Sequence, residues 1–172
     1  KYIKSEALLR HSVTVEGVMR HFAELAGGDV EEWGLVGLLH DIDFELYPEE
    51  HCSKCVEILA GEGFDMRFIR SVQSHGFGLC SNIAPESRME KVLYTIDELT
   101  GLVYAAVLMR PSKSIADLET KSVMKKFKTA SFAANVNREV IRNGAEMLGM
   151  SVDEVVAETI AGMKKTAAEI GI

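Results

Sequence analysis

Residues 35–43, LVGLLHDID, place a histidine and an aspartate directly after an apolar run. At about 100° per residue in an α-helix, His40 falls on the same face as Trp33, Val36 and Gly37, which is the apolar and therefore buried face. A buried imidazole next to a buried carboxylate costs a few kcal/mol unless both find partners. A metal ion bound by both the imidazole and the carboxylate would be a partner for each. For an isolated histidine, a hydrogen bond inside the core is the simpler alternative.

Outward from this segment, apolar residues recur at helical spacing, and the alternating runs typical of strands are almost absent. With only three prolines in 172 residues, this pattern predicts an all-α protein. The predicted helices cover residues 4–26, 30–40, 49–60, 65–74, 86–109, 120–127, 132–148 and 152–169. The longest non-periodic stretch, RPSKSIADLE at 110–119, is expected to be a loop.

Helix ends are marked by polar residues and prolines. Two capping boxes are predicted from a polar residue followed three positions later by a glutamate, namely Asp29 with Glu32 and Ser151 with Glu154. Pro48 and Pro85 suit the first position of a helix. In the last helix, one apolar stripe predicts core packing and consists of Val152, Val155, Val156, Ile160, Met163, Ala167 and Ile170.

Four further residues offer ligand atoms that could join the His40–Asp41 pair. His11 precedes the pair by 29 residues on a predicted helix, His51 follows it after a proline, and His75 ends a helix just before a glycine. Asp97 lies at the edge of the apolar stripe of a long helix, where a carboxylate is costly unless it is paired or bound to a cation. Such groups on different helices would converge inside a bundle. Imidazole and carboxylate ligands together suit zinc, iron, manganese, cobalt or nickel.

Three segments resemble the HD superfamily of metal-dependent phosphohydrolases: HSVTV at 11–15, GLLHDID at 37–43 and YTIDELTG at 94–101. The resemblance covers residues 5–105. The length of 172 residues predicts a single domain over 1–172. The resemblance implies an HD-domain helical bundle, in which the metal-binding core is followed by extra C-terminal helices at 106–172. The motifs imply nothing specific about that extension.

Carried over position by position, the resemblance implies that His11, His40, Asp41 and Asp97 hold one divalent metal ion. Some branches of the superfamily hold a second ion through two histidines between the doublet and the last aspartate. His51 and His75 fall in that interval, with Asp41 as the bridge. The alternative is that His51, in EEHCSKC, lies on the surface and that one metal binds. His21 is a spare histidine, rotated about 280° from His11 on the same helix, and is expected at the surface.

One departure from the family concerns the substrate. Many relatives continue the doublet as Ile-Gly-Lys, and the lysine can meet a substrate phosphate, whereas this chain continues Ile42-Asp43-Phe44. Lys121 and Lys125, which share a helix face with Lys128, are candidates for the missing cation. The alternative is an ordinary solvated basic face. Lys113 and Arg138 are further options that sequence does not rank.

Composition limits the class of partner. Nineteen basic and 26 acidic residues give a formal net charge of −7, which argues against a nucleic-acid polymer as the partner. A small anionic substrate remains compatible, since a bound metal ion can dominate the local field. We expect neither a membrane-spanning segment nor a signal peptide, and a cytoplasmic location. The three cysteines include a lone CxxC, Cys52 with Cys55, which we expect to be reduced thiols rather than a zinc or redox motif.

The expected function is metal-dependent hydrolysis of a phosphate ester, with a nucleotide or another small phosphorylated metabolite as substrate, a metal-activated water as nucleophile and Asp41 as the central catalytic carboxylate. One alternative is a di-iron oxygenase of the same fold, since the ligand types also suit iron. Another is a non-catalytic HD-type signalling module. The sequence contains no P-loop segment, which argues against a P-loop kinase.

Overall fold

The computed structural model describes residues 1–172 and is all-α, as predicted, with no β-strand. Two short 3₁₀ turns, Pro48–Glu50 and Ser74–Gly76, accompany the α-helices. The α-helices are α1 (Glu6–Ala26), α2 (Val30–Leu39), α3 (Cys55–Gly61), α4 (Met66–Gln73), α5 (Arg88–Leu108), α6 (Thr120–Phe127), α7 (Arg138–Leu148), α8 (Val152–Lys165) and α9 (Ala167–Ile170). Residues 110–119 form no helix, as predicted.

Three predicted helices differ from the structure. The helix predicted at 49–60 is broken, because Cys52 adopts a left-handed φ of 65° and α3 begins only at Cys55. The helix predicted at 132–148 begins only at Arg138, after a left-handed turn at Ala133. The final helix is interrupted at Thr166, which separates α8 from α9.

The helix caps follow the predictions in part. Ser151 and Glu154 form the predicted capping box. Asp29 caps α2, but its box is not closed, because the Glu32 carboxylate accepts a hydrogen bond from Arg67 instead. Pro48 lies at the start of a 3₁₀ turn as predicted. Pro85 does not begin a helix, because Ser87 with Glu90 forms an unpredicted capping box at the start of α5.

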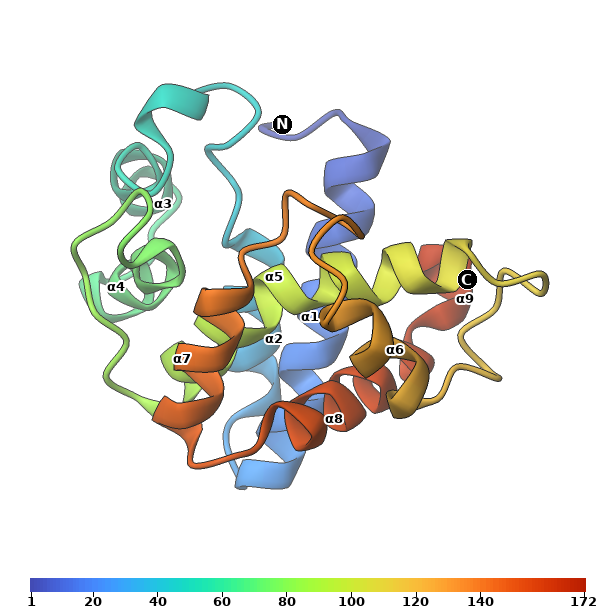
Figure 1. Ribbon diagram of the computed structural model, residues 1–172. Helices are drawn as coiled ribbons and strands as arrows, with labels where there is room; N and C mark the ends of the chain where they lie inside the picture. The colour runs from blue at the N-terminus through green and yellow to red at the C-terminus, as the bar shows by residue number, and fades with distance from the viewer.

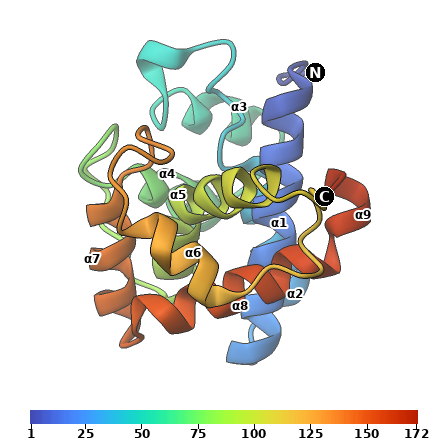
Figure 2. The same ribbon diagram turned by 45° about the vertical axis from the view of Figure 1, so that its right-hand side comes forward.

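Helix α1 is the element around which the metal-ligand candidates are arranged, since α2, α5 and α8 all pack against it. Figures 1 and 2 show α5 crossing α1, with α8 and α9 beside them and α3 and α4 grouped at another side of the molecule. Gly37 lets α2 approach α1 closely, since a Cβ atom there would collide with Met19 and with the Val15 carbonyl oxygen. This contact brings the end of α2, and with it His40, next to α1.

One cluster of 34 buried apolar residues runs from Val15 to Ile170 and includes five residues of the predicted stripe, whereas Val152 and Ala167 are partly buried and pack against it. The prediction for His21 is wrong: its side chain is buried, and its Nε2 lies 2.7 Å from a carboxylate oxygen of Glu158 on α8. Packing of α8 over this face of α1 covers the histidine, and helical rotation within α1 alone could not indicate that.

No helix in the structure has the length and apolar character that crossing a membrane would require.

Candidate metal centre

Six side chains that the sequence singled out meet in the interior, although they come from five separate segments. His11 is on α1 and Asp97 is on α5. His40 and Asp41 follow the last turn of α2, where the chain leaves the helix. His51 follows the first 3₁₀ turn and His75 lies in the second.

The first group of ligand atoms comes from His11, His40, Asp97 and one oxygen of Asp41. His11 Nε2 lies 3.1 Å from His40 Nε2 and 3.0 Å from Asp97 Oδ1, and His40 Nε2 lies 3.3 Å from the same Asp97 oxygen. Asp41 Oδ2 completes the group at 3.4 Å from His40 Nε2 and 3.7 Å from His11 Nε2. Two imidazole nitrogens and two carboxylate oxygens therefore face a common point.

The second group uses the other oxygen of the same aspartate. Asp41 Oδ1 lies 3.4 Å from His51 Nε2 and 3.6 Å from His75 Nε2, and the two histidine nitrogens are 3.2 Å apart. His51 is therefore not a freely solvated surface residue. Asp41 stands between the groups, with one oxygen toward each.

Hydrogen bonds at the far side of three imidazole rings fix how those rings point. Nδ1 of His40 lies 2.7 Å from the Gly37 carbonyl oxygen, and Nδ1 of His75 lies 2.6 Å from the Val72 carbonyl oxygen. Nδ1 of His51 lies 2.8 Å from Asp43 Oδ1. A neutral ring that donates from Nδ1 leaves the Nε2 lone pair free. This is the arrangement that orients histidine ligands in metal sites.

Asp43 is a buried hydrogen-bond partner of the second group that the sequence motifs did not single out. It is completely buried, and its second oxygen accepts a hydrogen bond of 2.7 Å from the backbone N–H of Cys55. The sequence reading treated this position only as a departure from the family pattern. A polar residue two positions after the doublet, in an otherwise apolar run, was the only available signal.

The carboxylates give the site a strong attraction for positive charge. Burial opposes charging of His40, but Asp41 and Asp97 outweigh it and raise the His40 pKa well above its usual value. Burial likewise opposes charging of Asp97, yet His40 and His11 bring its pKa well below the usual range. For His51, burial is outweighed by Asp43, Cys80 and Asp41, which raise the pKa to about 10. Protons and metal cations are the two kinds of positive charge that can satisfy this field.

The donor set and spacing fit divalent transition metals. Ligands about 2.0–2.2 Å from a common ion are separated from each other by about 3.0 Å at right angles and about 3.5 Å in a tetrahedron. The separations given above, 3.0–3.7 Å, cover every pair except the two carboxylates of the first group, Asp41 and Asp97, and they match this range. Four imidazoles with carboxylates are a mixed nitrogen and oxygen set, suited to manganese, iron, cobalt, nickel or zinc.

The cysteines lie beside the second group, but the CxxC pair does not form a site of its own. All three thiols are free, and the Cys55 thiol donates to the Cys52 carbonyl oxygen. The Cys52 sulfur instead lies 2.7 Å from that of Cys80, and with His51 these two thiols form a further group of potential ligands. Sequence spacing could not pair Cys80 with Cys52, because the chain between them folds through α3 and α4.

The centre opens on the side of α1 and α5. The His11 and Asp97 side chains are 27% and 22% exposed, whereas His40 and His75 are almost completely covered at 0% and 3%. A small molecule would therefore reach the ligand atoms past His11 and Asp97. This exposed edge determines which cavities are relevant to a substrate.

The structure does not bring the predicted substrate-binding lysines into this group. Lys121 and Lys125 line cavities around α6 that contain none of the six ligand candidates. Arg138 is engaged with backbone carbonyl oxygens, namely those of Phe127, Thr129, Phe132, Ala133 and Val136. A role of Lys121 or Lys125 in binding substrate stays a prediction.

Comparison with known proteins adds no family to these observations. No family model matches the chain, and neither a curated protein nor a solved structure matches it. Membership of the HD superfamily therefore remains a prediction from the three sequence motifs. The chemistry proposed below rests on those motifs together with the geometry of the six side chains.

Proposed function

We propose that this protein is a metal-dependent phosphohydrolase of the HD type that acts on a nucleotide or another small phosphorylated metabolite. The observation that carries the proposal is the position of Asp41, whose two oxygens each face a separate pair of histidine Nε2 atoms. Two neighbouring cation sites that share one carboxylate are suited to clamping the oxygens of a phosphoryl group. The three HD-like motifs support the same class of chemistry.

Some of these residues would bind the metal ions, and others orient the residues that bind them. His11, His40 and Asp97 would hold one ion, His51 and His75 a second, and Asp41 would bridge them and serve as the catalytic carboxylate. Such ions lower the pKa of a bound water toward about 7 and neutralise phosphoryl oxygens. Asp43 keeps the His51 ring turned so that its Nε2 faces Asp41.

We infer two ions rather than one, because His51 and His75 complete the second group. The proposed ions are manganese, iron, zinc, cobalt or nickel, since all of these accept imidazole and carboxylate ligands. The net charge of −7 supports a small phosphorylated substrate rather than a nucleic-acid polymer. Three free thiols fit a reducing compartment, which supports the cytoplasm as the proposed location.

Elemental analysis with a hydrolysis assay tests the proposal. Protein loaded separately with each metal is offered a panel of phosphorylated metabolites, with Asp41→Asn as the inactive comparison. Release of inorganic phosphate that requires both metal and Asp41 supports the proposal. Failure of the protein to bind any metal, or phosphate release unaffected by Asp41→Asn, would contradict it.

The di-iron oxygenase alternative is tested with the same preparations. Oxygen uptake by the iron-loaded protein, without phosphate release under any metal, would favour that chemistry.

The predicted role of Lys121 and Lys125 on α6 in binding substrate is tested by steady-state kinetics. If Lys121 or Lys125 binds substrate, its replacement by Met raises KM for phosphorylated substrates and leaves the metal content intact.

A further inference from the structure

We propose that the cavity between α1 and α5 binds the leaving group of the substrate, and that Arg10 at its far end recognises a second anionic group there. This inference rests on the proposed phosphohydrolase function. It narrows the substrate to a short phosphate monoester whose leaving group ends in a carboxylate or a further phosphate. The cavity has a volume of about 230 Å³ and is lined by Ala7, Arg10, His11, Thr14, Thr100, Gly101 and Tyr104.

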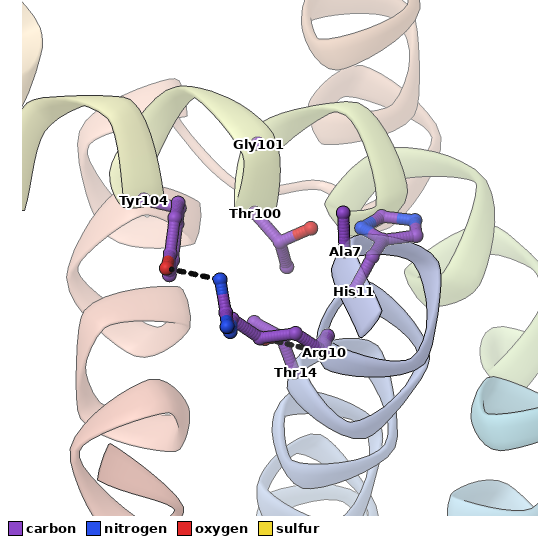
Figure 3. A pocket seen from close by; sticks show the side chains of 7 residues that line it. All are labelled: Ala7, Arg10, His11, Thr14, Thr100, Gly101 and Tyr104. Atoms are coloured by element: carbon purple, nitrogen blue, oxygen red, sulfur yellow. Dashed lines mark hydrogen bonds between the residues drawn. The ribbon is translucent and has the colours of Figure 1, made fainter. Parts of the chain in front are cut away.

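The cavity borders the candidate metal centre at one residue, His11. His11 is both a lining residue and the most exposed histidine of the ligand group, at 27%. Figure 3 shows His11 at one side of the cavity, with Arg10 and Tyr104 toward the other. A substrate whose phosphate meets the ligand group can therefore extend its remaining part into this space.

Arg10 is a cation without an acidic partner. The guanidinium donates a hydrogen bond of 3.1 Å to the Tyr104 hydroxyl, across the cavity from α1 to α5 (Figure 3). No carboxylate lies within salt-bridge distance of it. Of the other seven arginines, Arg88 and Arg138 also lack a carboxylate partner, and Arg138 is bound by backbone carbonyl oxygens instead. The remaining five have a carboxylate partner: Arg20, Arg67, Arg70, Arg110 and Arg142. In a protein of net charge −7, an unpaired guanidinium in a cavity is suited to an anionic ligand.

Two of the residues that line the cavity, Thr14 and Thr100, are threonines that are almost completely buried. Thr14 donates its hydroxyl proton to the Arg10 carbonyl oxygen at 2.7 Å, and Thr100 donates to the Asp97 carbonyl oxygen at 2.7 Å. Since each hydroxyl has used its only proton on a backbone carbonyl oxygen, neither threonine offers the ligand a hydrogen-bond donor. An aliphatic chain therefore fits this part of the cavity.

The dimensions restrict the length of the leaving group. Asp97 and Tyr104 are seven residues apart on α5, which corresponds to about 10 Å along the helix axis. After contact distances at both ends are subtracted, a chain of roughly three or four carbon atoms fits between the two anionic groups. The volume is also below the range of about 300–1,000 Å³ typical of sites for drug-sized ligands.

A pair of phosphonates that cannot be hydrolysed tests the proposal by binding rather than by turnover. Isothermal titration calorimetry is performed on the Mn²⁺-loaded protein with 4-phosphonobutyrate and with butylphosphonate, which lacks the terminal carboxylate. We expect 4-phosphonobutyrate to bind at least tenfold more tightly, as a hydrogen bond between charged groups allows. Arg10→Gln should remove this preference while leaving butylphosphonate affinity and manganese content unchanged.

The control variant is Arg142→Gln, which removes a positive charge from a surface arginine paired with Glu139 and should keep the preference. Equal binding of the two phosphonates by the unmodified protein, or a preference that survives Arg10→Gln, would overturn the assignment of Arg10 and leave the phosphohydrolase proposal standing. If neither phosphonate binds the manganese-loaded protein, both proposals fail.

Discussion

The Nε2 atoms of His11 and His40 lie 3.1 Å apart, although the two residues belong to different helices and are separated by 29 positions. Because His40 Nδ1 is directed at the Gly37 carbonyl oxygen, the neutral ring would present a lone pair to His11. A proton on His11 Nε2, or a metal ion bound by both rings, satisfies the His40 lone pair. The neighbouring carboxylates of Asp41 and Asp97 favour a metal cation at this position.

Metal binding is expected to stabilise the fold measurably. A ligand that binds only the folded state at 100 times its dissociation constant adds about 2.7 kcal/mol, which corresponds to a rise in Tm of about 5–10 °C for a chain of this length. Differential scanning fluorimetry with each metal, before and after chelation, measures the rise. Asp97→Asn should abolish most of it, and an equal rise in that variant would remove Asp97 from the ligand set.

The second group predicts a change in stoichiometry. His51→Ala or His75→Ala should reduce the bound metal from two ions to one while the circular dichroism spectrum stays helical. His21→Ala is the matched control, since His21 pairs with Glu158 away from the ligand atoms, and it should retain two ions. Two ions in His51→Ala or His75→Ala would show that the second site does not depend on these rings.

The helical class could be predicted because it depends on local periodicity, and the ligand candidates could be named because three short motifs resemble the HD superfamily. Helical periodicity places His40 on a buried face, and buried imidazoles and carboxylates need partners that few other groups supply. The burial of His21 depends on α8, which arrives from the other end of the chain, and the pairing of Cys52 with Cys80 depends on the path through α3 and α4. The helix predicted at 49–60 is broken at Cys52, whose left-handed φ of 65° cannot be predicted from apolar periodicity.

Asp43→Asn should weaken metal binding without removing a ligand. Both oxygens of Asp43 accept hydrogen bonds from N–H groups, one from His51 and one from Cys55. An asparagine has only one oxygen, so its N–H₂ group would face one of these two N–H donors. Loss of such an orienting partner costs about 10–100-fold in metal affinity. Competition with a chromogenic chelator measures the affinity. Asp29→Asn, at the cap of α2, is the control and should bind metal normally.

Glu90 predicts how stability depends on pH at a distance from the metal centre. Burial raises the pKa of this carboxyl, but hydrogen bonds from Arg70 and from the backbone N–H groups of Glu86 and Ser87 outweigh it, and the pKa lies below its usual value. The unfolded chain therefore takes up the proton at a higher pH, about 4.3 for a free glutamate. The stabilisation is complete above that pH and is lost as the pH falls through the lower folded-state pKa.

Glu90→Gln should lower the free energy of unfolding by about 1–3 kcal/mol at pH 7, since its N–H₂ group would face donors in place of an acceptor. The difference from the unmodified protein should shrink below pH 4, where the carboxyl takes up its proton. Urea unfolding at a series of pH values measures both effects. Glu57→Gln removes an exposed carboxylate paired with Lys54 and should change stability by less than about 0.5 kcal/mol. If Glu90→Gln lowers the free energy of unfolding equally at pH 7 and pH 3, the charge of Glu90 does not contribute to stability.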